Sequence, residues 1–142
     1  MDVARRRDGE GVEQDYEKAF EYTLLAAEQG HPKSCYNIGW SYEQGEGVEQ
    51  DYDEALKYYK LASEYGNNAG TFAVGELYYL GLGVDQDLEE AAKWYLQALD
   101  EGYEPDEEDR KHLKEVLGED AAPQTELETE QENTLVRRAD DK

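Results

Sequence analysis

The chain has 142 residues, enough for about one domain, and only 38% of them are hydrophobic, so its core is expected to be thin. Its 36 acidic and 14 basic residues give a formal charge of −22, which opposes binding to nucleic acid or to an anionic membrane and is more compatible with a basic partner or none. No segment approaches the roughly 20 apolar residues of a membrane span, and the first residues lack the apolar stretch of a secretory signal. We therefore expect a cytoplasmic protein, with a leader missing from this sequence as the alternative.

One octapeptide recurs along the chain. The string GEGVEQDY occupies residues 9–16 and again 45–52, and it returns as GLGVDQDL at residues 81–88, each copy 36 residues after the one before. A fixed period of about 20 to 50 residues is typical of stacked helical or mixed units, none of which buries its apolar face alone. Such arrays are usually surfaces for binding other proteins.

The first unit, residues 1–30, is predicted to be incomplete. Asp15 is expected to cap a helix that ends at Gly30. Only seven residues precede Asp8, too few for another full helix, and three of them are arginines where apolar residues would be needed. Either the chain is cut from a longer array or its first helix is a degenerate cap. The open side of this unit is a candidate surface for pairing with a second copy in a homodimer.

Residues 31–66 and 67–102 are predicted to be two complete units of two helices each. The first helix of a unit, here called helix A, runs in the earlier unit from Pro32 to about Gln44 and ends at Gly45, a residue that tolerates positive φ. Small and apolar residues recur along it at helical spacing and define its buried stripe. The stripe comprises Ser34, Ile38, Ser41 and Tyr42 in one unit, and Gly70, Val74, Leu77 and Tyr78 in the next.

The second helix of a unit, helix B, begins after an aspartate, Asp51 or Asp87, whose side chain can cap the free N–H groups of the first turn. In both units a glutamate follows three residues later, as a capping box requires. Glycines end these helices at Gly66 and Gly102. Alanines that allow close approach alternate with tyrosines that fill space, namely Ala55, Tyr59 and Ala62, then Ala91, Tyr95 and Ala98.

Beyond residue 102 the period fails. Residues 103–118 predict a helix that caps the last unit, with Pro105 at its first position and acidic residues near the positive end of its dipole. Residues 119–142 are rich in Glu, Gln and Thr, and they contain too few apolar residues to offset the entropy lost on ordering. We expect them to form a disordered acidic tail.

The two complete units share a family pattern. Residues 38–66 read IGWSYEQGEGVEQDYDEALKYYKLASEYG, and residues 74–102 read VGELYYLGLGVDQDLEEAAKWYLQALDEG. Both resemble Sel1-like repeats, relatives of tetratricopeptide repeats, whose pattern is LG..Y..G.GV..D...A..WY..AA..G. Residues 9–30 resemble the second half of such a repeat. The resemblance implies an all-α fold, an α/α superhelical solenoid of helix-turn-helix repeats in which helix A lines the concave surface, acting as an adaptor or scaffold.

Nothing in the sequence assembles a catalytic, metal or cofactor site, so we expect a non-enzymatic protein that needs no cofactor. His31 and His112 lie far apart, without a Cys or His at ligand spacing. The Gly-x-Gly turns lack the Lys-Ser/Thr of a P-loop and follow helices rather than strands. Cys35 cannot form an internal disulfide, has no neighbouring base, and is expected to be an inert thiol.

Helix A also carries aromatic and acidic residues on the side opposite to its buried stripe. They are Tyr36, Trp40 and Glu43 in the second unit, and Phe72, Glu76 and Tyr79 in the third. Because aromatic side chains are the usual anchors of binding hot spots, we predict that these six residues form a protein-binding groove, with Glu43 and Glu76 drawing basic side chains. The alternative is core packing between repeats, above all for Tyr36 and Phe72.

Three functions remain open at this stage. The leading hypothesis is an adaptor that holds a peptide or helix of a partner protein in the concave groove. The second is charge-based, with the acidic surface mimicking nucleic acid or shielding a basic protein. The third is a regulatory module of a longer protein.

Overall fold

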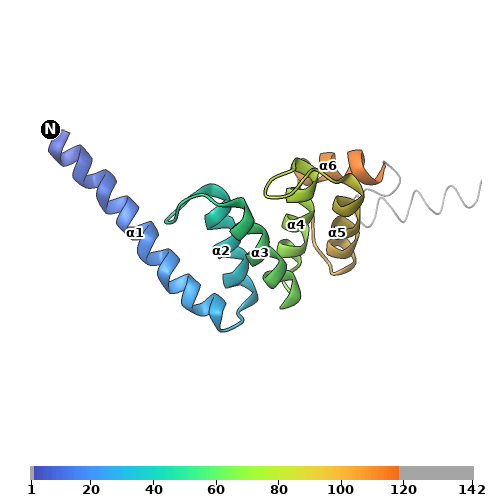
Figure 1. The fold of residues 1–142 in the computed structure, drawn as a ribbon, viewed down its shortest axis with the longest axis horizontal. Coiled ribbons are helices and arrows are strands. Elements are labelled where there is room, and N and C mark those ends of the chain that lie inside the picture. Colours follow the sequence, from blue (N-terminus) through green and yellow to red (C-terminus); the bar gives the residue numbers. More distant parts are fainter. Residues whose placement is uncertain (1, 119–142) are drawn as a thin grey trace, which may run out of the picture. The chain divides into compact units, whose positions relative to one another are not determined.

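The computed structural model describes residues 2–118, and only the backbone of residues 2–13. This range contains six helices and no strand, which confirms the all-α prediction (Figure 1). The helices are α1 (Asp2–Glu28), α2 (Pro32–Gln44), α3 (Tyr52–Glu64), α4 (Asn68–Leu80), α5 (Leu88–Asp100) and α6 (Glu107–Leu117). The tail predicted for residues 119–142 lies outside the described part of the chain.

The chain divides into two compact units, Met1–Tyr103 and Glu104–Lys142. In the first unit each helix packs against the next, α1 on α2, α2 on α3, α3 on α4 and α4 on α5, as in a helical repeat array. Helices α2 and α4 are the predicted A helices, and α3 and α5 are the predicted B helices. The two A helices also contact each other.

Glycines end the A helices, as predicted. Gly45 and Gly81 both have a φ of 71°, a left-handed conformation that closes the last turn. The amide of Gly45 donates to the carbonyl of Ser41 at 2.7 Å, and that of Gly81 donates to the carbonyl of Leu77 at 2.8 Å. The two helix ends are therefore built alike.

The Gln-Asp pair of the octapeptide holds the loop between helix A and helix B. The Gln50 side-chain amide donates to the carbonyl of Glu43 at 2.7 Å, and that of Gln86 donates to the carbonyl of Tyr79 at 2.8 Å. The following aspartates cap helix B, because their carboxylates accept from the amides of Glu54 at 3.2 Å and Glu90 at 3.0 Å. The predicted caps at Asp51 and Asp87 are thus confirmed.

The core depends on a tyrosine of helix B lying against a glycine of helix A. A Cβ atom on Gly39 would lie 2.6 Å from the ring of Tyr59, and one on Gly75 would lie 2.6 Å from the ring of Tyr95. Both rings are almost fully buried. Any larger residue at either glycine would force the two helices of that repeat apart.

Cys35 belongs to this core. Its side chain is fully buried, and its thiol donates to the carbonyl of Ala27 at 3.6 Å. Burial raises the pKa of the Cys35 thiol, which disfavours the reactive thiolate. The structure therefore favours the interpretation of an inert thiol.

The prediction for the start of the first helix is wrong. Residues 9–16 lie inside the continuous helix α1, although the identical octapeptide at residues 45–52 forms a turn and a helix start. Asp15 therefore caps no helix. In repeats two and three the turn joins two helices that pack on each other, whereas α2 is the only described helix with extensive contacts to α1. Without a second helix to pack against, a turn here would break helical hydrogen bonds and would bury no additional apolar surface. The homodimer through this unit stays a prediction.

Helix α6 begins two residues later than predicted. Pro105 precedes the helix, and Asp106 is the N-cap residue, forming a reciprocal capping box with Asp109. The box satisfies the backbone N–H groups of Asp106 and Asp109. The role of this helix as a cap on the last repeat stays a prediction.

The two copies of the octapeptide allow a matched test of context. We expect Gly11→Ala to stabilise the protein by roughly 0.5 to 1 kcal/mol, because Ala is the better residue inside a helix. We expect Gly47→Ala to destabilise it by roughly 1 to 3 kcal/mol, because a side chain is strained in the left-handed region. The φ of Gly47 is 77°, and a Cβ atom there would clash with the carbonyl oxygen of Tyr16.

Urea unfolding followed by circular dichroism measures both effects. Equal destabilisation by the two substitutions would show that residues 9–15 form the turn in solution and would contradict a continuous α1.

Candidate protein-interaction site

The six predicted site residues occupy equivalent positions on the two A helices, 36 residues apart. Tyr36 corresponds to Phe72, Trp40 to Glu76, and Glu43 to Tyr79. The aromatic and acidic residues are therefore exchanged at two positions one helical turn apart. All six residues lie on α2 and α4, two helices that contact each other. Their burial and their hydrogen bonds differ.

Phe72 belongs to the core and not to the surface. It is 2% exposed, and its ring lies between those of Tyr95 and Tyr103, with centroids at 4.7 and 4.5 Å. Tyr36 is partly buried, and its ring centroid lies 5.5 Å from that of Tyr59. Phe72 is therefore a core residue, as the alternative interpretation expected. Its assignment as a groove contact is corrected, because a partner would find almost none of its surface.

The two glutamates bind the buried tyrosines of helix B. The Tyr59 hydroxyl donates to Glu43 Oε1 at 2.6 Å, and the Tyr95 hydroxyl donates to Glu76 Oε2 at 2.7 Å. Burial first, and then the neighbouring Glu43 carboxylate, raise the pKa of Tyr59 well above its usual range. Each glutamate therefore has a structural role that the sequence interpretation missed.

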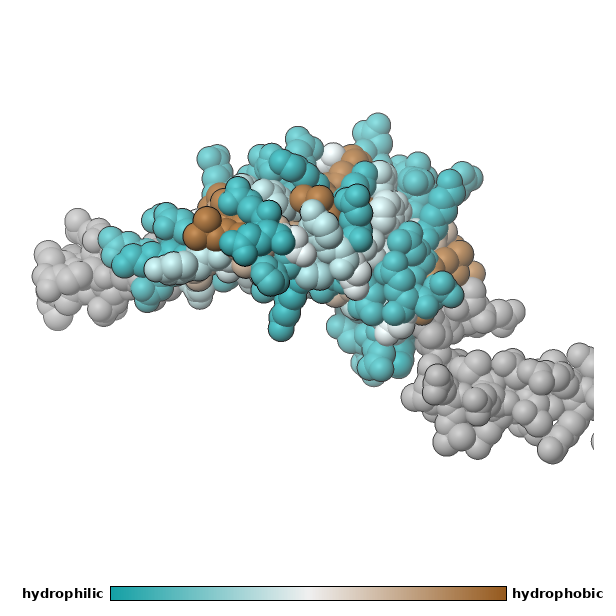
Figure 2. Space-filling view, turned by 90° about the horizontal axis from the view of Figure 1, so that it is seen from below, coloured by the Kyte–Doolittle hydropathy of each residue, from teal (hydrophilic) through white to brown (hydrophobic). Residues whose placement is uncertain are grey.

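The surface left on the A helices has few apolar side chains. Trp40 is 39% exposed, Leu80 is 50% exposed, and Tyr79 is partly buried. The face drawn in Figure 2 likewise shows small, separate hydrophobic groups within a mostly hydrophilic surface. A partner would therefore be held by a few aromatic and aliphatic anchors and not by a broad apolar patch.

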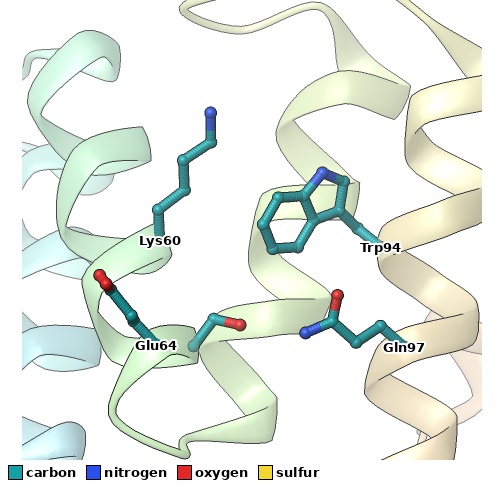
Figure 3. A pocket seen from close by; sticks show the side chains of 5 residues that line it. Lys60, Glu64, Trp94 and Gln97 are labelled. Atoms are coloured by element: carbon teal, nitrogen blue, oxygen red, sulfur yellow. The ribbon is translucent and has the colours of Figure 1, made fainter.

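The B helices form a pocket that sequence reasoning did not predict. Its lining residues are Lys60, Ser63 and Glu64 of α3 and Trp94 and Gln97 of α5, around a volume of about 460 Å³ (Figure 3). Trp94 stands 36 residues after Tyr58. The change from tyrosine to the larger indole was the one available signal.

Two further findings concern the described residues as a group. Between residues 2 and 118, no three His, Cys, Asp or Glu side chains are arranged to hold a metal ion. Within the same stretch, none of the helices has the length and apolar character needed to cross a membrane.

The role of Glu43 in stability can be separated from any role in binding. We expect Glu43→Ala to lower the free energy of unfolding by roughly 1 to 3 kcal/mol, because the Tyr59 hydroxyl loses its acceptor. Glu43→Gln keeps an acceptor oxygen and should cost less. Urea unfolding measures both. Adding Tyr59→Phe to Glu43→Ala should recover part of the loss, and a purely additive double variant would contradict the assigned bond.

The repeat architecture matches known proteins. The Sel1 repeat family model matches residues 3–31, 32–67 and 69–103. A search of curated proteins gave no match. Among solved structures, a Sel1 repeat protein from Oxalobacter formigenes is 33% identical with a TM-score of 0.59, covering 70% of this chain and 39% of its own. The protein c5321, a protective antigen of uropathogenic Escherichia coli with an SLR fold, is 38% identical with a TM-score of 0.61, covering 70% and 21%.

A third solved structure, Helicobacter pylori cysteine rich protein B, is 31% identical with a TM-score of 0.58, covering 61% of this chain and 65% of its own. The chain thus spans less than two thirds of each of these three relatives. The matched family segments together take up most of the sequence, and they coincide with the helical array of the first compact unit. The chain belongs to the Sel1 repeat family.

Proposed function

We propose that this chain is a non-enzymatic scaffold that holds a peptide or helix of a partner protein on the exposed side of α2 and α4. Proteins with Sel1 repeats are in general scaffolds for protein interactions. The observation that carries the proposal is the exposure of Trp40, because an indole left 39% exposed on a helix of the array is the residue type most enriched in hot spots.

The exchange of aromatic and acidic residues gives the two A helices their aromatic residues at different positions. In α2, Glu43 binds Tyr59, so the position one turn earlier is released from the core and carries Trp40. In α4, Glu76 binds Tyr95 from that earlier position, so the later one carries Tyr79. Each A helix thus satisfies its buried tyrosine with one of the two residues and carries an aromatic ring at the other.

The proposed contacts are therefore Trp40, Tyr79 and Leu80, with Tyr36 at their edge. Glu43 and Glu76 add negative charge beside the aromatic rings, which favours a partner with basic side chains next to its apolar ones. The same charge disfavours acidic partners, so it contributes to specificity.

Affinity capture from the native lysate tests this surface. We expect the Trp40→Ala/Tyr79→Ala variant to lose one or a few specific partners, because truncation removes the apolar anchors. The matched control is Tyr22→Ala/Leu25→Ala, which removes two side chains that are 75% and 57% exposed on α1. Both variants are checked for helicity by circular dichroism. Unchanged capture by the folded Trp40/Tyr79 variant would contradict the proposed site.

A second candidate function is charge-based binding of a basic protein, favoured by the formal charge of −22. The salt dependence of affinity separates the two functions. An electrostatic complex should weaken at least tenfold between about 50 and 300 mM salt, whereas a complex held by apolar anchors should change little. Isothermal titration calorimetry with the captured partner measures this slope, and a flat slope would eliminate the charge-based function.

A further inference from the structure

The pocket between α3 and α5 is distinct from the A-helix surface. Its volume of about 460 Å³ falls in the usual range of ligand pockets, roughly 300 to 1,000 Å³. One wall carries the indole of Trp94, and the opposite wall carries Lys60 and Glu64 (Figure 3). The pocket therefore combines an aromatic face with charged and neutral polar groups.

A hydrogen-bond network behind the pocket fixes the protons of its polar groups. Thr71 is fully buried, and its hydroxyl lies 2.8 Å from Glu101 Oε1 and 3.4 Å from the carbonyl of Asn67. A carboxylate can only accept, and its bond is the shorter one, so Thr71 donates to Glu101. Ser63 is hydrogen-bonded to the Thr71 oxygen. Because the Thr71 proton is already committed, Ser63 must be the donor in that bond.

The same carboxylate orients Gln97. Its Nε2 donates to Glu101 Oε2 at 3.0 Å, so the amide cannot be turned the other way without facing oxygen with oxygen. Figure 3 shows the amide oxygen of Gln97 turned toward the indole of Trp94. Ser63 and Gln97 therefore offer acceptor oxygens to a ligand. Figure 3 shows the Glu64 carboxylate turned away from Trp94 and Gln97, so Glu64 contributes negative charge at the α3 side of the pocket.

Lys60 is the one cation that lines this pocket. Its ammonium lies 5.7 Å from the ring centroid of Tyr78, a cation–π distance, and Figure 3 shows it pointing away from the Glu64 carboxylate. The indole of Trp94 therefore has the amide oxygen of Gln97 beside it, and the negative charge of Glu64 lies on the opposite wall.

We propose that this pocket binds the guanidinium group of an arginine side chain from a protein partner. A guanidinium has five N–H donors and no acceptor, so it matches the acceptor oxygens of Ser63 and Gln97. Its plane stacks on an indole, which an ammonium matches less well. The charge of −22 attracts basic partners over distance. The inference rests on the proposed scaffold function, because it supplies a protein as the source of the arginine.

Titration of the full chain with Nα-acetyl-arginine amide tests the pocket. The readout is the indole N–H signal of Trp94 in a ¹H–¹⁵N spectrum, assigned with Trp94→Phe, with the Trp40 signal as internal control. We expect a saturable shift of Trp94 alone. The citrulline analogue, which has the same shape but no charge and fewer donors, should bind at least tenfold more weakly. Equal binding of the two compounds, or an equal shift of Trp40, would overturn the proposal.

Two variants check the charges. Glu64→Gln should weaken arginine binding about tenfold, and Lys60→Gln should strengthen it, because removing a like charge lowers repulsion. Both side chains are exposed, so neither substitution threatens the fold. An unchanged affinity in Glu64→Gln would overturn the site. Free L-arginine binding tenfold more tightly than the blocked form would overturn the assignment to a protein side chain.

The outcome is separable from that of the A-helix surface. Arginine binding involves no residue of α2, so its failure contradicts only the pocket. If arginine does not bind but the Trp40→Ala/Tyr79→Ala variant loses its partner, the scaffold proposal stands. Conversely, arginine binding with capture unaffected by that variant would contradict the A-helix site alone.

Discussion

The array depends on one contact, a buried tyrosine of helix B lying against a glycine of helix A. It occurs twice, as Tyr59 on Gly39 and Tyr95 on Gly75. The glycine allows the helices to approach, and the ring fills the space that a larger side chain would otherwise take. A phenol so placed must still satisfy its hydroxyl, because a buried donor without an acceptor costs about 1 to 3 kcal/mol. The packing contact thus creates a second requirement, for a carboxylate on helix A.

That requirement connects stability with the proposed interaction surface. The carboxylate can stand at either of two positions one turn apart, and the chain uses each position once, with Glu43 and Glu76. The position not used by the acid carries an aromatic residue. In these two repeats the acidic and aromatic residues at the two positions are therefore exchanged as a pair. This pairing is also why the two A helices expose different rings at different heights.

Helix boundaries in the two complete repeats followed from the sequence because local signals decide them. Asp51 and Asp87 cap the B helices, and Gly45 and Gly81 end the A helices. Each does so through hydrogen bonds to residues only a few positions away in the sequence. Residues 9–16 could not be predicted this way, since the same eight letters lie within a helix there and form a turn and a helix start at 45–52, where a second packed helix is present. The burial of Phe72 was equally hidden. It depends on Tyr103, 31 positions later, which helical spacing within one repeat cannot report.

The pocket between α3 and α5 likewise could not be predicted from local sequence signals. Its proton arrangement follows from Glu101, which lies at the end of helix B and binds Thr71 of the preceding helix A and Gln97 of its own helix. The corresponding residue of the second repeat is Tyr65, so the network cannot recur there. Repeats that share a backbone therefore differ in chemistry at the positions that face solvent or the next repeat. In an array whose buried positions are fixed by the glycine–tyrosine contact, both proposed sites depend on such departures, Trp40 and Tyr79 on the A helices and Glu101 behind the pocket.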